Sequence, residues 1–487
     1  MRFILYCVVG CFICSGVSVA TAKSGNNCHE NMKWLIETFS KNDAGYQHIV
    51  DKKGTHSINE HNTKHLEHAS LIEQPEECEQ LMKSLLDYFR TGHIGIRYQA
   101  KSSSTEPMSN EQLKLKFQSH AKHPINIAKF EQNIIQQENK DFEGIWKSGN
   151  YTIGITKADD EYIGFIIEAD GVYWHPGQIK LHFKESNSNW SGQFYMRDHS
   201  PRAIDSVKLF SNNILKTGIS TWYRLQPEVK LTKEEKQYIE FIEKDEPYFK
   251  ILSDSTAYIR IPSFAYENKV KIDSLVKDNL DLINARENLI IDIRGNGGGS
   301  DASYSSLIPL LYTNPIETVG TKLLSTPLNN SKYEQILNSD DWSDEDKKWI
   351  KSLHDKLIQN VGGFIRPNQY AISVHEEEKI MAKPAKVAII IDEANGSTAE
   401  QFLLAAKQSH KVKLFGRTTM GVLDVSNVHQ VDSPDGQFRL WYATSLTERL
   451  PGFPIDDIGI QPDYFIHDST PEHLWLRAVK KKIELDR

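Results

Sequence analysis

An uninterrupted apolar run at residues 387–391 places the strongest constraint on the fold. A strand without polar alternation is buried on both faces, and such strands belong to parallel sheets that helices cover. Residues 289–293, Leu-Ile-Ile-Asp-Ile, predict a second buried strand, after a strand pattern at 257–261 and a stretch with helical apolar spacing at 272–283. Strand, helix and strand together predict a parallel α/β core.

Ser397 follows the run 387–391 and precedes a stretch, 399–410, whose apolar residues fall on one helical face. The serine is therefore predicted at a strand-to-helix corner, where helix-start N–H groups can stabilise an oxyanion. The same residues, Ser-Thr-Ala-Glu, form a capping box in which the hydroxyl only accepts a hydrogen bond from the helix. This stretch alone leaves both roles open.

The strand at 289–293 runs into the sequence D-I-R-G-N-G-G-G, residues 292–299. Three consecutive glycines leave backbone N–H groups unobstructed, so these groups can point at a reacting oxygen. A phosphate-binding loop is not indicated, because neither G-x-x-x-x-G-K-[ST] nor a helix-opening G-x-G-x-x-G occurs here. A plain tight turn is the alternative.

Four motifs resemble, in the same order, those of the tail-specific (C-terminal processing) peptidases and the tricorn core protease. They are D-I-R-x-N-x-G-G at 292–299, N-G-S-x-A-E at 395–400, G-R-T-T-x-G at 416–421 and G-I-x-P-D at 459–463. The resemblance covers residues 248–466 and implies a crotonase-like (ClpP/crotonase) α/β peptidase core. It also implies that Ser397 is the nucleophile, with the backbone amides of Thr398, Gly298 and Gly299 as oxyanion donors.

The chain departs from the resemblance at the general base. The processing peptidases carry a lysine just after the G-x-T-x-G element, whereas Val422 stands there in this sequence. The tricorn-like branch uses an upstream histidine, to which His93 in Thr-Gly-His corresponds, and a late carboxylate, which we match to Asp456 with Asp457 as the alternate. The second serine of that arrangement has no counterpart that we can place.

The residue types fit serine catalysis. A serine hydroxyl is a weak nucleophile until a base takes its proton, and imidazole titrates near neutral pH. A carboxylate on the other ring nitrogen would fix the tautomer and stabilise the imidazolium. The sequence alone also allows His93 to be an ordinary surface residue at a helix-to-strand junction.

The N-terminus has the pattern of a signal peptide at residues 1–22, with Arg2, an apolar run at 3–19 and a small-x-small ending. We therefore expect an exported, periplasmic or extracellular protein without a membrane span. Residues 8–11 also resemble a lipoprotein box, so a lipid anchor at Cys11 is an alternative. Cys28 and Cys78 are the cysteines left after cleavage, and an even pair in an exported chain suggests a disulfide.

The pattern predicts consecutive domains. These are an N-terminal helical unit at 23–92, a mainly antiparallel β domain at 93–230, a peptidase core at 245–470 with a helical lid at 321–374, and a C-terminal helix at 471–487.

The 487 residues have a formal net charge of −8 and no long run of one sign, so no nucleic-acid partner is expected. No cofactor is implied. The histidine-rich stretch 56–68 lacks metal-binding spacing and is better explained as a polar helix. The sequence thus predicts an exported serine endopeptidase acting on protein or peptide substrates. A catalytically inactive ligand-binding protein on the same fold, and a scaffold whose β domain carries the function, are the alternatives.

Overall fold

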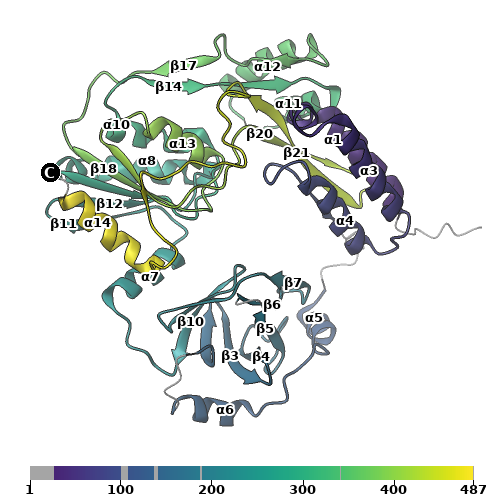
Figure 1. Ribbon diagram of the computed structural model, residues 1–487, viewed down its shortest axis with the longest axis vertical. Helices are drawn as coiled ribbons and strands as arrows, with labels where there is room; N and C mark the ends of the chain where they lie inside the picture. Colours follow the sequence, from purple (N-terminus) through teal and green to yellow (C-terminus); the bar gives the residue numbers. More distant parts are fainter. Residues whose placement is uncertain (1–26, 100–107, 137–140, 187–188, 341, 486–487) are drawn as a thin grey trace, which may run out of the picture. The chain divides into compact units, whose positions relative to one another are not determined.

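The computed structural model describes residues 27–99, 108–136, 141–186, 189–340 and 342–485 (Figure 1). The predicted signal peptide at 1–22, with Cys11, lies outside these residues. The chain forms two compact units. Unit 1 comprises Met1–Ala100, Thr321–Gln369 and Val425–Glu448, and unit 2 comprises Lys101–Gly320, Tyr370–Asp424 and Arg449–Arg487.

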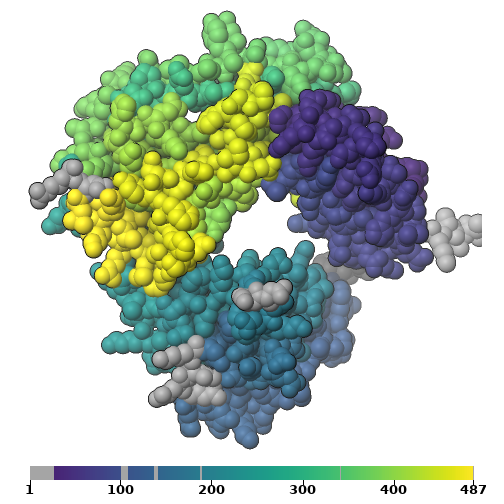
Figure 2. Space-filling model, viewed as in Figure 1, coloured from purple at the N-terminus to yellow at the C-terminus, as the bar shows by residue number. Residues whose placement is uncertain are grey.

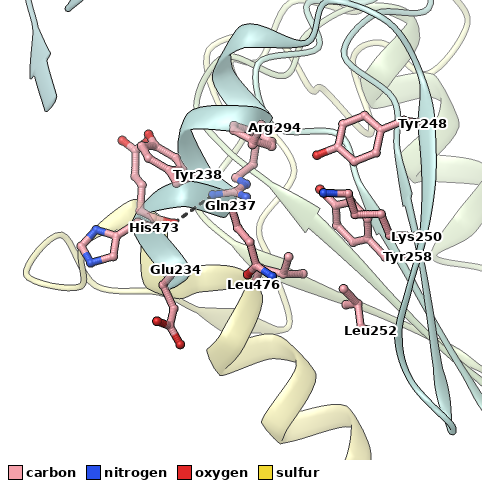
Figure 3. Close-up of a pocket in the computed structure, with 12 residues that line it drawn as sticks. Glu234, Gln237, Tyr238, Tyr248, Lys250, Leu252, Tyr258, Arg294, His473 and Leu476 are labelled. Atoms are coloured by element: carbon pink, nitrogen blue, oxygen red, sulfur yellow. Dashed lines mark hydrogen bonds between the residues drawn. The ribbon is translucent and has the colours of Figure 1, made fainter. Parts of the chain in front are cut away.

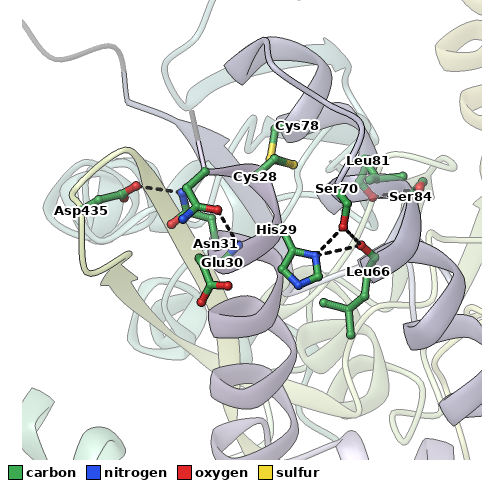
Figure 4. The surroundings of a disulfide bond; sticks show 11 residues. Cys28, His29, Glu30, Asn31, Leu66, Ser70, Cys78, Leu81, Ser84 and Asp435 are labelled. Carbon is green, nitrogen blue, oxygen red and sulfur yellow. Dashed lines mark hydrogen bonds between the residues drawn. A yellow bond between two sulfur atoms is a disulfide. The ribbon is translucent and has the colours of Figure 1, made fainter. Parts of the chain in front are cut away.

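Unit 1 begins with four helices whose apolar residues recur at three and four positions. Met32, Leu35 and Phe39 on the first helix are buried against the other helices and the unit's sheet. The helices are α1 (Cys28–Asn42), α2 (Tyr46–Lys53), α3 (Thr55–Ala69) and α4 (Pro75–Asp87). Cys28 on α1 and Cys78 on α4 form a disulfide bond, and Asn31 nearby donates a hydrogen bond of 2.8 Å to Asp435 (Figure 4).

The sheet of unit 1 is built from distant parts of the sequence. Its strands are β1 (Gly95–Tyr98), β15 (Thr321–Leu324), β16 (Phe364–Ile365), β20 (Val425–Asp432) and β21 (Phe438–Thr447). The long strand β21 pairs with β1, β15 and β20, all antiparallel. The helices α11 (Pro327–Asn338) and α12 (Asp344–Ile358) lie between β15 and β16 in the chain.

Unit 2 contains a nine-stranded antiparallel sheet, coloured blue to teal in the space-filling view (Figure 2). Its core contains the fully buried Trp146, Trp174 and Trp222. The strands are β2 (Gly144–Ser148), β3 (Tyr151–Ala158), β4 (Glu161–Glu168), β5 (Ile179–Ser186), β6 (Asn189–Tyr195), β7 (Pro201–Ile204), β8 (Lys208–Phe210), β9 (Ile214–Lys216) and β10 (Thr221–Gln226), accompanied by α5 (Asn110–Phe117) and α6 (Ile127–Ile134). This antiparallel sheet was predicted from the alternating pattern, and the prediction is confirmed.

The second sheet of unit 2 is mainly parallel, as the apolar runs predict. Its order is β11-β12-β13-β18-β19-β22, and every pair except β11–β12 is parallel. The strands are β11 (Tyr248–Ser253), β12 (Thr256–Arg260), β13 (Asn288–Asp292), β18 (Lys386–Ile391), β19 (Val412–Gly416) and β22 (Tyr464–Phe465). All residues of β12 and β13 are buried, which is the burial expected of strands covered on both faces.

Apolar side chains from helices pack on both faces of this sheet. One face packs against the helices α8 (Lys269–Asp278), α9 (Leu280–Asn284), α10 (Ile308–Leu311) and α13 (Thr398–Ala406) and the 3-10 helix η2 (Asp301–Leu307). The other face packs against α14 (Trp475–Leu485), which follows the 3-10 helix η3 (Glu472–Leu474). The remaining elements are α7 (Lys233–Glu243), η1 (Tyr266–Asn268) and the two-stranded sheet β14 (Ile316–Val319) with β17 (Ile372–His375).

The observed units differ from the consecutive domains predicted from the sequence. Residues 321–369, predicted as part of a lid, belong with the N-terminal helices, because β15 pairs with β21 rather than with the parallel sheet. Residues 95–98 likewise pair with β21 and not with the β domain. None of the described helices is long and apolar enough to cross a membrane.

Candidate active site

Ser397 lies between the buried strand β18 and the helix α13, at the corner that the sequence predicts. Its backbone has φ +56° and ψ −123°. Ordinary N-cap residues have extended backbone, and a non-glycine residue at positive φ is strained by about 1–3 kcal/mol. Such strain is typical of functional sites, so this backbone favours a role beyond helix capping.

Glu400 holds the corner in place from one turn into α13. Its carboxylate is fully buried and accepts a 3.1 Å hydrogen bond from the Ser397 N–H. It also accepts hydrogen bonds from the Thr419 hydroxyl at 2.6 Å, the Gly421 N–H at 2.8 Å and the Val422 N–H at 2.9 Å. One side chain therefore joins the serine corner to the segment 419–422. The sequence pattern indicates this glutamate only as part of a capping box.

The glycine loop lies directly beside the serine. A Cβ atom on Gly298, whose φ is +107°, would lie 2.9 Å from the Ser397 Cβ. A Cβ atom on Gly299, whose φ is +145°, would lie 2.3 Å from the Phe264 backbone. Only glycine fits either position, because any side chain would collide with backbone or with the serine.

The amides of this region differ in their hydrogen bonds. The Gly298 N–H donates to the Asn296 side chain at 2.9 Å, so it is already engaged. The N–H groups of Gly299 and Thr398 donate no hydrogen bond to another residue in the described part of the chain. These two amides can therefore receive an oxyanion, whereas the predicted contribution of Gly298 meets a competing acceptor.

Buried polar side chains fix the loop and the corner to each other. Asn395 donates hydrogen bonds to the Ile293 carbonyl at 2.5 Å and the Asn296 carbonyl at 3.1 Å. Asp392 accepts hydrogen bonds from the Gly295 N–H at 2.9 and 3.0 Å. Burial raises the pKa of Asp392 to about 6, although the Gly295 hydrogen bond opposes the shift. The motif N-G-S-x-A-E pointed to Asn395 without indicating its role.

Arg294 holds the start of the glycine loop through Asp292. Its guanidinium, which lies at the cavity drawn in Figure 3, donates a 2.6 Å hydrogen bond to Asp292 and a 3.2 Å hydrogen bond to the Glu472 carbonyl. Burial alone would raise the pKa of Asp292, but the charge and hydrogen bonds of Arg294 together with the Arg260 charge outweigh burial, and the net pKa is lowered. The cavity beside Arg294 and Tyr238 has a volume of about 20 Å³, which suits a single water molecule and not a peptide.

The segment after Val422 is held by two aspartates. Asp456 accepts hydrogen bonds from the Leu423 N–H at 2.5 Å and the Asp424 N–H at 2.6 Å. Asp424 is fully buried and accepts hydrogen bonds from the Ile455 N–H at 2.6 Å and the Asp456 N–H at 2.8 Å. This reciprocal pair fixes the backbone that leads into Val425.

Val422 follows the G-R-T-T-x-G element, where the resemblance to the processing peptidases would lead us to expect a lysine. Its N–H is bound by Glu400 at 2.9 Å. Its side chain lies beside Gly396, where an added Cβ atom would be 2.7 Å from the Val422 Cγ2. An apolar side chain therefore stands next to the serine corner.

His93 belongs to unit 1, between α4 and β1, and has a φ of +55°. Its Nδ1 lies 2.6 Å from the Val425 carbonyl oxygen, within the same unit. Because a carbonyl oxygen only accepts hydrogen bonds, Nδ1 carries the proton, and in the neutral ring Nε2 holds the lone pair. The carbonyl of Val425 is thus a group that fixes the tautomer of the His93 ring.

The loop that carries His93 is anchored by a buried ion pair. Arg90 pairs with Asp43 at 2.7 Å and donates hydrogen bonds to the carbonyls of Gly92 at 2.9 Å and His93 at 3.2 Å. Burial lowers the pKa of His93, the Val425 hydrogen bond opposes this shift, and the Arg90 charge adds to it. The ring is therefore neutral at neutral pH, which is the protonation state that a general base requires.

The described residues contain no group of three or more His, Cys, Asp or Glu side chains that could hold a metal ion. Two histidines of α3 contact protein groups. His61 contacts the Leu85 carbonyl at 3.1 Å, and His65 contacts the Ser84 hydroxyl at 2.9 Å.

A strained serine at a strand-to-helix corner, beside a glycine loop, is an arrangement that suits the chemistry of a serine hydrolase. Residues 255–466 match the model of Peptidase family S41, and this match supports a serine peptidase. The Ser397 corner and the glycine loop both lie inside the matched region. No curated protein matches the sequence significantly.

Solved structures resemble the chain in fold. Mature CPAF is 12% identical, with a TM-score of 0.52, over 94% of this chain and 96% of that one. Mature CPAF complexed with lactacystin is 12% identical, with a TM-score of 0.51, over 94% of this chain and 98% of that one. The tricorn protease is 12% identical, with a TM-score of 0.42, over 94% of this chain and 36% of that one. At these identities the CPAF structures establish the fold alone.

Proposed function

We propose that the protein is an exported serine endopeptidase that forms an acyl-enzyme on Ser397, with His93 as the general base. The observation that carries the proposal is the strained Ser397 backbone, joined through Glu400 to the segment 419–422. That segment continues within three residues to Val425, whose carbonyl holds the His93 ring.

In the proposed first step, the Ser397 Oγ attacks the carbonyl carbon of a peptide bond while Nε2 of His93 takes the hydroxyl proton. The carbonyl oxygen becomes an oxyanion, which accepts hydrogen bonds from the Gly299 and Thr398 amides. Collapse breaks the C–N bond, and His93 returns the proton to the leaving amine. Water, activated by the same histidine, then hydrolyses the ester and frees Ser397.

In this mechanism, the carbonyl of Val425 keeps the His93 proton on Nδ1, so that Nε2 can act as the base. Asp456 acts as a positioning residue, because it holds the two N–H groups immediately before Val425. Export is supported by the sequence pattern of residues 1–22 and agrees with the Cys28–Cys78 disulfide, since such bonds persist in oxidising compartments.

Labelling of the mature protein with a fluorophosphonate probe tests the proposal. We expect the parent protein to be labelled, Ser397→Ala to be unlabelled, and His93→Ala to react about 10²- to 10⁴-fold more slowly. Ser305→Ala and His410→Ala are matched controls, because both residues are exposed, and both should react like the parent.

Two results would contradict the proposal at different points. An unlabelled parent, or equal labelling after Ser397→Ala, would remove the peptidase function and favour a ligand-binding protein on this fold. An unchanged labelling rate in His93→Ala would remove only the assignment of the base.

A further inference from the structure

We propose that the cavity between α13 and the loop 449–461 is a substrate subsite, which takes an apolar side chain from an extended peptide two to three residues from the cleaved bond. This inference rests on the proposed peptidase function and extends it to a class of substrate. All residues of the cavity belong to unit 2.

The cavity has the size and the lining of a side-chain pocket. Its volume is about 540 Å³, within the range of about 300–1,000 Å³ usual for ligand sites. Its apolar lining comes from β14, α13 and the loop, and consists of Val319, Leu404, Phe453, Pro454, Ile455, Ile458 and Ile460. Phe453 is 57% exposed and Ile458 is 54% exposed. Large apolar side chains gathered around one hollow mark a binding surface.

Hydrogen bonds to Thr419 and Asp424 fix the backbone on one side of the cavity. The Ile460 N–H donates a 2.7 Å hydrogen bond to the Thr419 hydroxyl, and that hydroxyl donates to Glu400 at 2.6 Å. The Ile455 N–H is bound by Asp424 at 2.6 Å. The carboxylate that braces Ser397 therefore also anchors one side of this cavity.

Three glutamines line the cavity, and two of them, Gln401 and Gln408, differ in what they bind. The Gln408 amide is engaged by β14, since it accepts from the Glu317 N–H and donates to the Glu317 carbonyl, both at 2.8 Å. Gln401 is only 8% exposed, and its side-chain amide makes no hydrogen bond to another residue within the described ranges. An amide offers both a donor and an acceptor, as an extended peptide backbone requires.

The position of the cavity along α13 sets its distance from the cleaved bond. The Gln401 N–H donates to the Ser397 carbonyl at 3.0 Å, one turn into the helix. At about 1.5 Å per residue, Gln401 lies about 6 Å and Leu404 about 10 Å along the axis from Ser397. An extended peptide advances about 3.3 Å per residue, so it covers this range in about two to three residues.

The test uses Ile458→Arg, which places a charge at the cavity on an exposed position. Ile380→Arg is the matched control, because Ile380 is also 54% exposed in unit 2 and does not line the cavity. The parent and both variants are given an equimolar library of synthetic decapeptides, and the kcat/KM of each peptide is followed by mass spectrometry. A short fluorophosphonate, which does not reach the cavity, reports the reactivity of Ser397 separately.

We expect the parent and Ile380→Arg to prefer Leu, Ile or Phe two to three residues from the cleaved bond. Ile458→Arg should lower kcat/KM for these peptides about 10-fold or more and favour Asp or Glu at that position, while still reacting with the fluorophosphonate. An unchanged apolar preference in labelled Ile458→Arg would overturn the subsite. An unlabelled parent would instead overturn the peptidase function on which the subsite rests.

Discussion

At the scale of single residues, Glu400 connects the parts of the site within unit 2. Its two oxygens accept four hydrogen bonds, from the Thr419 hydroxyl and from three backbone N–H groups that include that of Ser397. A buried group with this many charge-assisted hydrogen bonds has one well-defined orientation. The orientation is transmitted to the serine corner because the bonded N–H groups are part of the backbone.

We therefore predict that Glu400→Gln destabilises the protein by about 2–4 kcal/mol, because the new NH₂ group faces two donors in a buried site. The rate of fluorophosphonate labelling should also fall in this variant, because the serine corner loses its fixed orientation. Urea unfolding and labelling kinetics measure the two effects. Glu378→Gln is the control at an exposed glutamate. Wild-type stability and labelling in Glu400→Gln would contradict the role of Glu400.

The pKa of His93 leads to a second prediction at this scale. Burial lowers that pKa below its ordinary value of 6.5, and the proposed mechanism uses the neutral ring as the base. Activity should therefore persist below pH 6.5 and fall only as the pH drops through the lowered pKa. The measurement is the pH profile of kcat/KM or of the labelling rate.

Asp392, whose pKa is about 6, could produce a similar acid limb. Recording the profile in Asp392→Asn separates the two groups, because the limb of His93 persists in that variant. An acid limb at or above pH 6.5 in both proteins would contradict the assignment of His93.

At the scale of elements, the site depends on the carboxyl ends of two neighbouring parallel strands. The glycine loop follows β13 and the serine corner follows β18, and these strands pair in register, with Ile291 opposite Ile389. Parallel pairing brings the two loops to the same edge of the sheet, where open α/β sheets bind their ligands. Asp392 joins them through the Gly295 N–H.

Asp392 gives a prediction for the stability of this edge. The folded protein keeps the carboxyl protonated up to about pH 6, whereas the unfolded chain releases the proton near pH 4. Its contribution to stability is therefore lost as the pH rises from about 4 to 6. Asn cannot ionise, so Asp392→Asn should gain about 1–2 kcal/mol over the parent between pH 4 and pH 7.5, allowing for partial solvent screening.

Urea unfolding at several pH values measures this difference. Asp278→Asn, at an exposed aspartate on α8, is the matched control and should show none of it. If Asp392→Asn and Asp278→Asn changed the free energy of unfolding by the same amount at every pH, the assignment to Asp392 would be wrong.

At the scale of the whole molecule, the catalytic residues that we propose belong to different units. Ser397 lies in unit 2 and His93 in unit 1. The stability of unit 1 therefore matters to the proposed base, and the Cys28–Cys78 disulfide links two of its helices across 50 residues of sequence. Closing a loop of this length stabilises by about 4 kcal/mol in the chain-entropy model.

Replacing both cysteines with serine should consequently loosen unit 1 selectively. We expect faster amide hydrogen exchange in α1 and α4, and unchanged exchange in β13 and β18 of unit 2. Mass spectrometry of peptic fragments measures both sets. Equal acceleration in the two units, or no change in α1 and α4, would contradict the prediction.

Much of the fold could be predicted from local patterns. The apolar runs predict β13 and β18 within one residue at each end, and Ser397 was correctly placed between β18 and α13. The alternating residues predict the large antiparallel sheet. These features are local, because the spacing of the apolar side chains within one element indicates which of its faces is buried.

The sheet of unit 1 could not be predicted in this way. Its strands β1, β15 and β21 are separated by more than a hundred residues of chain, and only tertiary packing decides which strands pair. The local pattern of residues 321–374 therefore predicts a separate insertion. The residues of β15 do not indicate that this strand pairs with β21.

The serine corner, the glycine loop and the valine at position 422 could be located from the sequence alone, because they depend on side-chain type and spacing. The tertiary structure decided what holds them. Glu400 acquires its role from the Thr419 hydroxyl and the N–H groups that surround it, and His93 is oriented by the carbonyl of Val425. Backbone groups are the same at every residue, so no sequence pattern can indicate which of them will meet a given side chain.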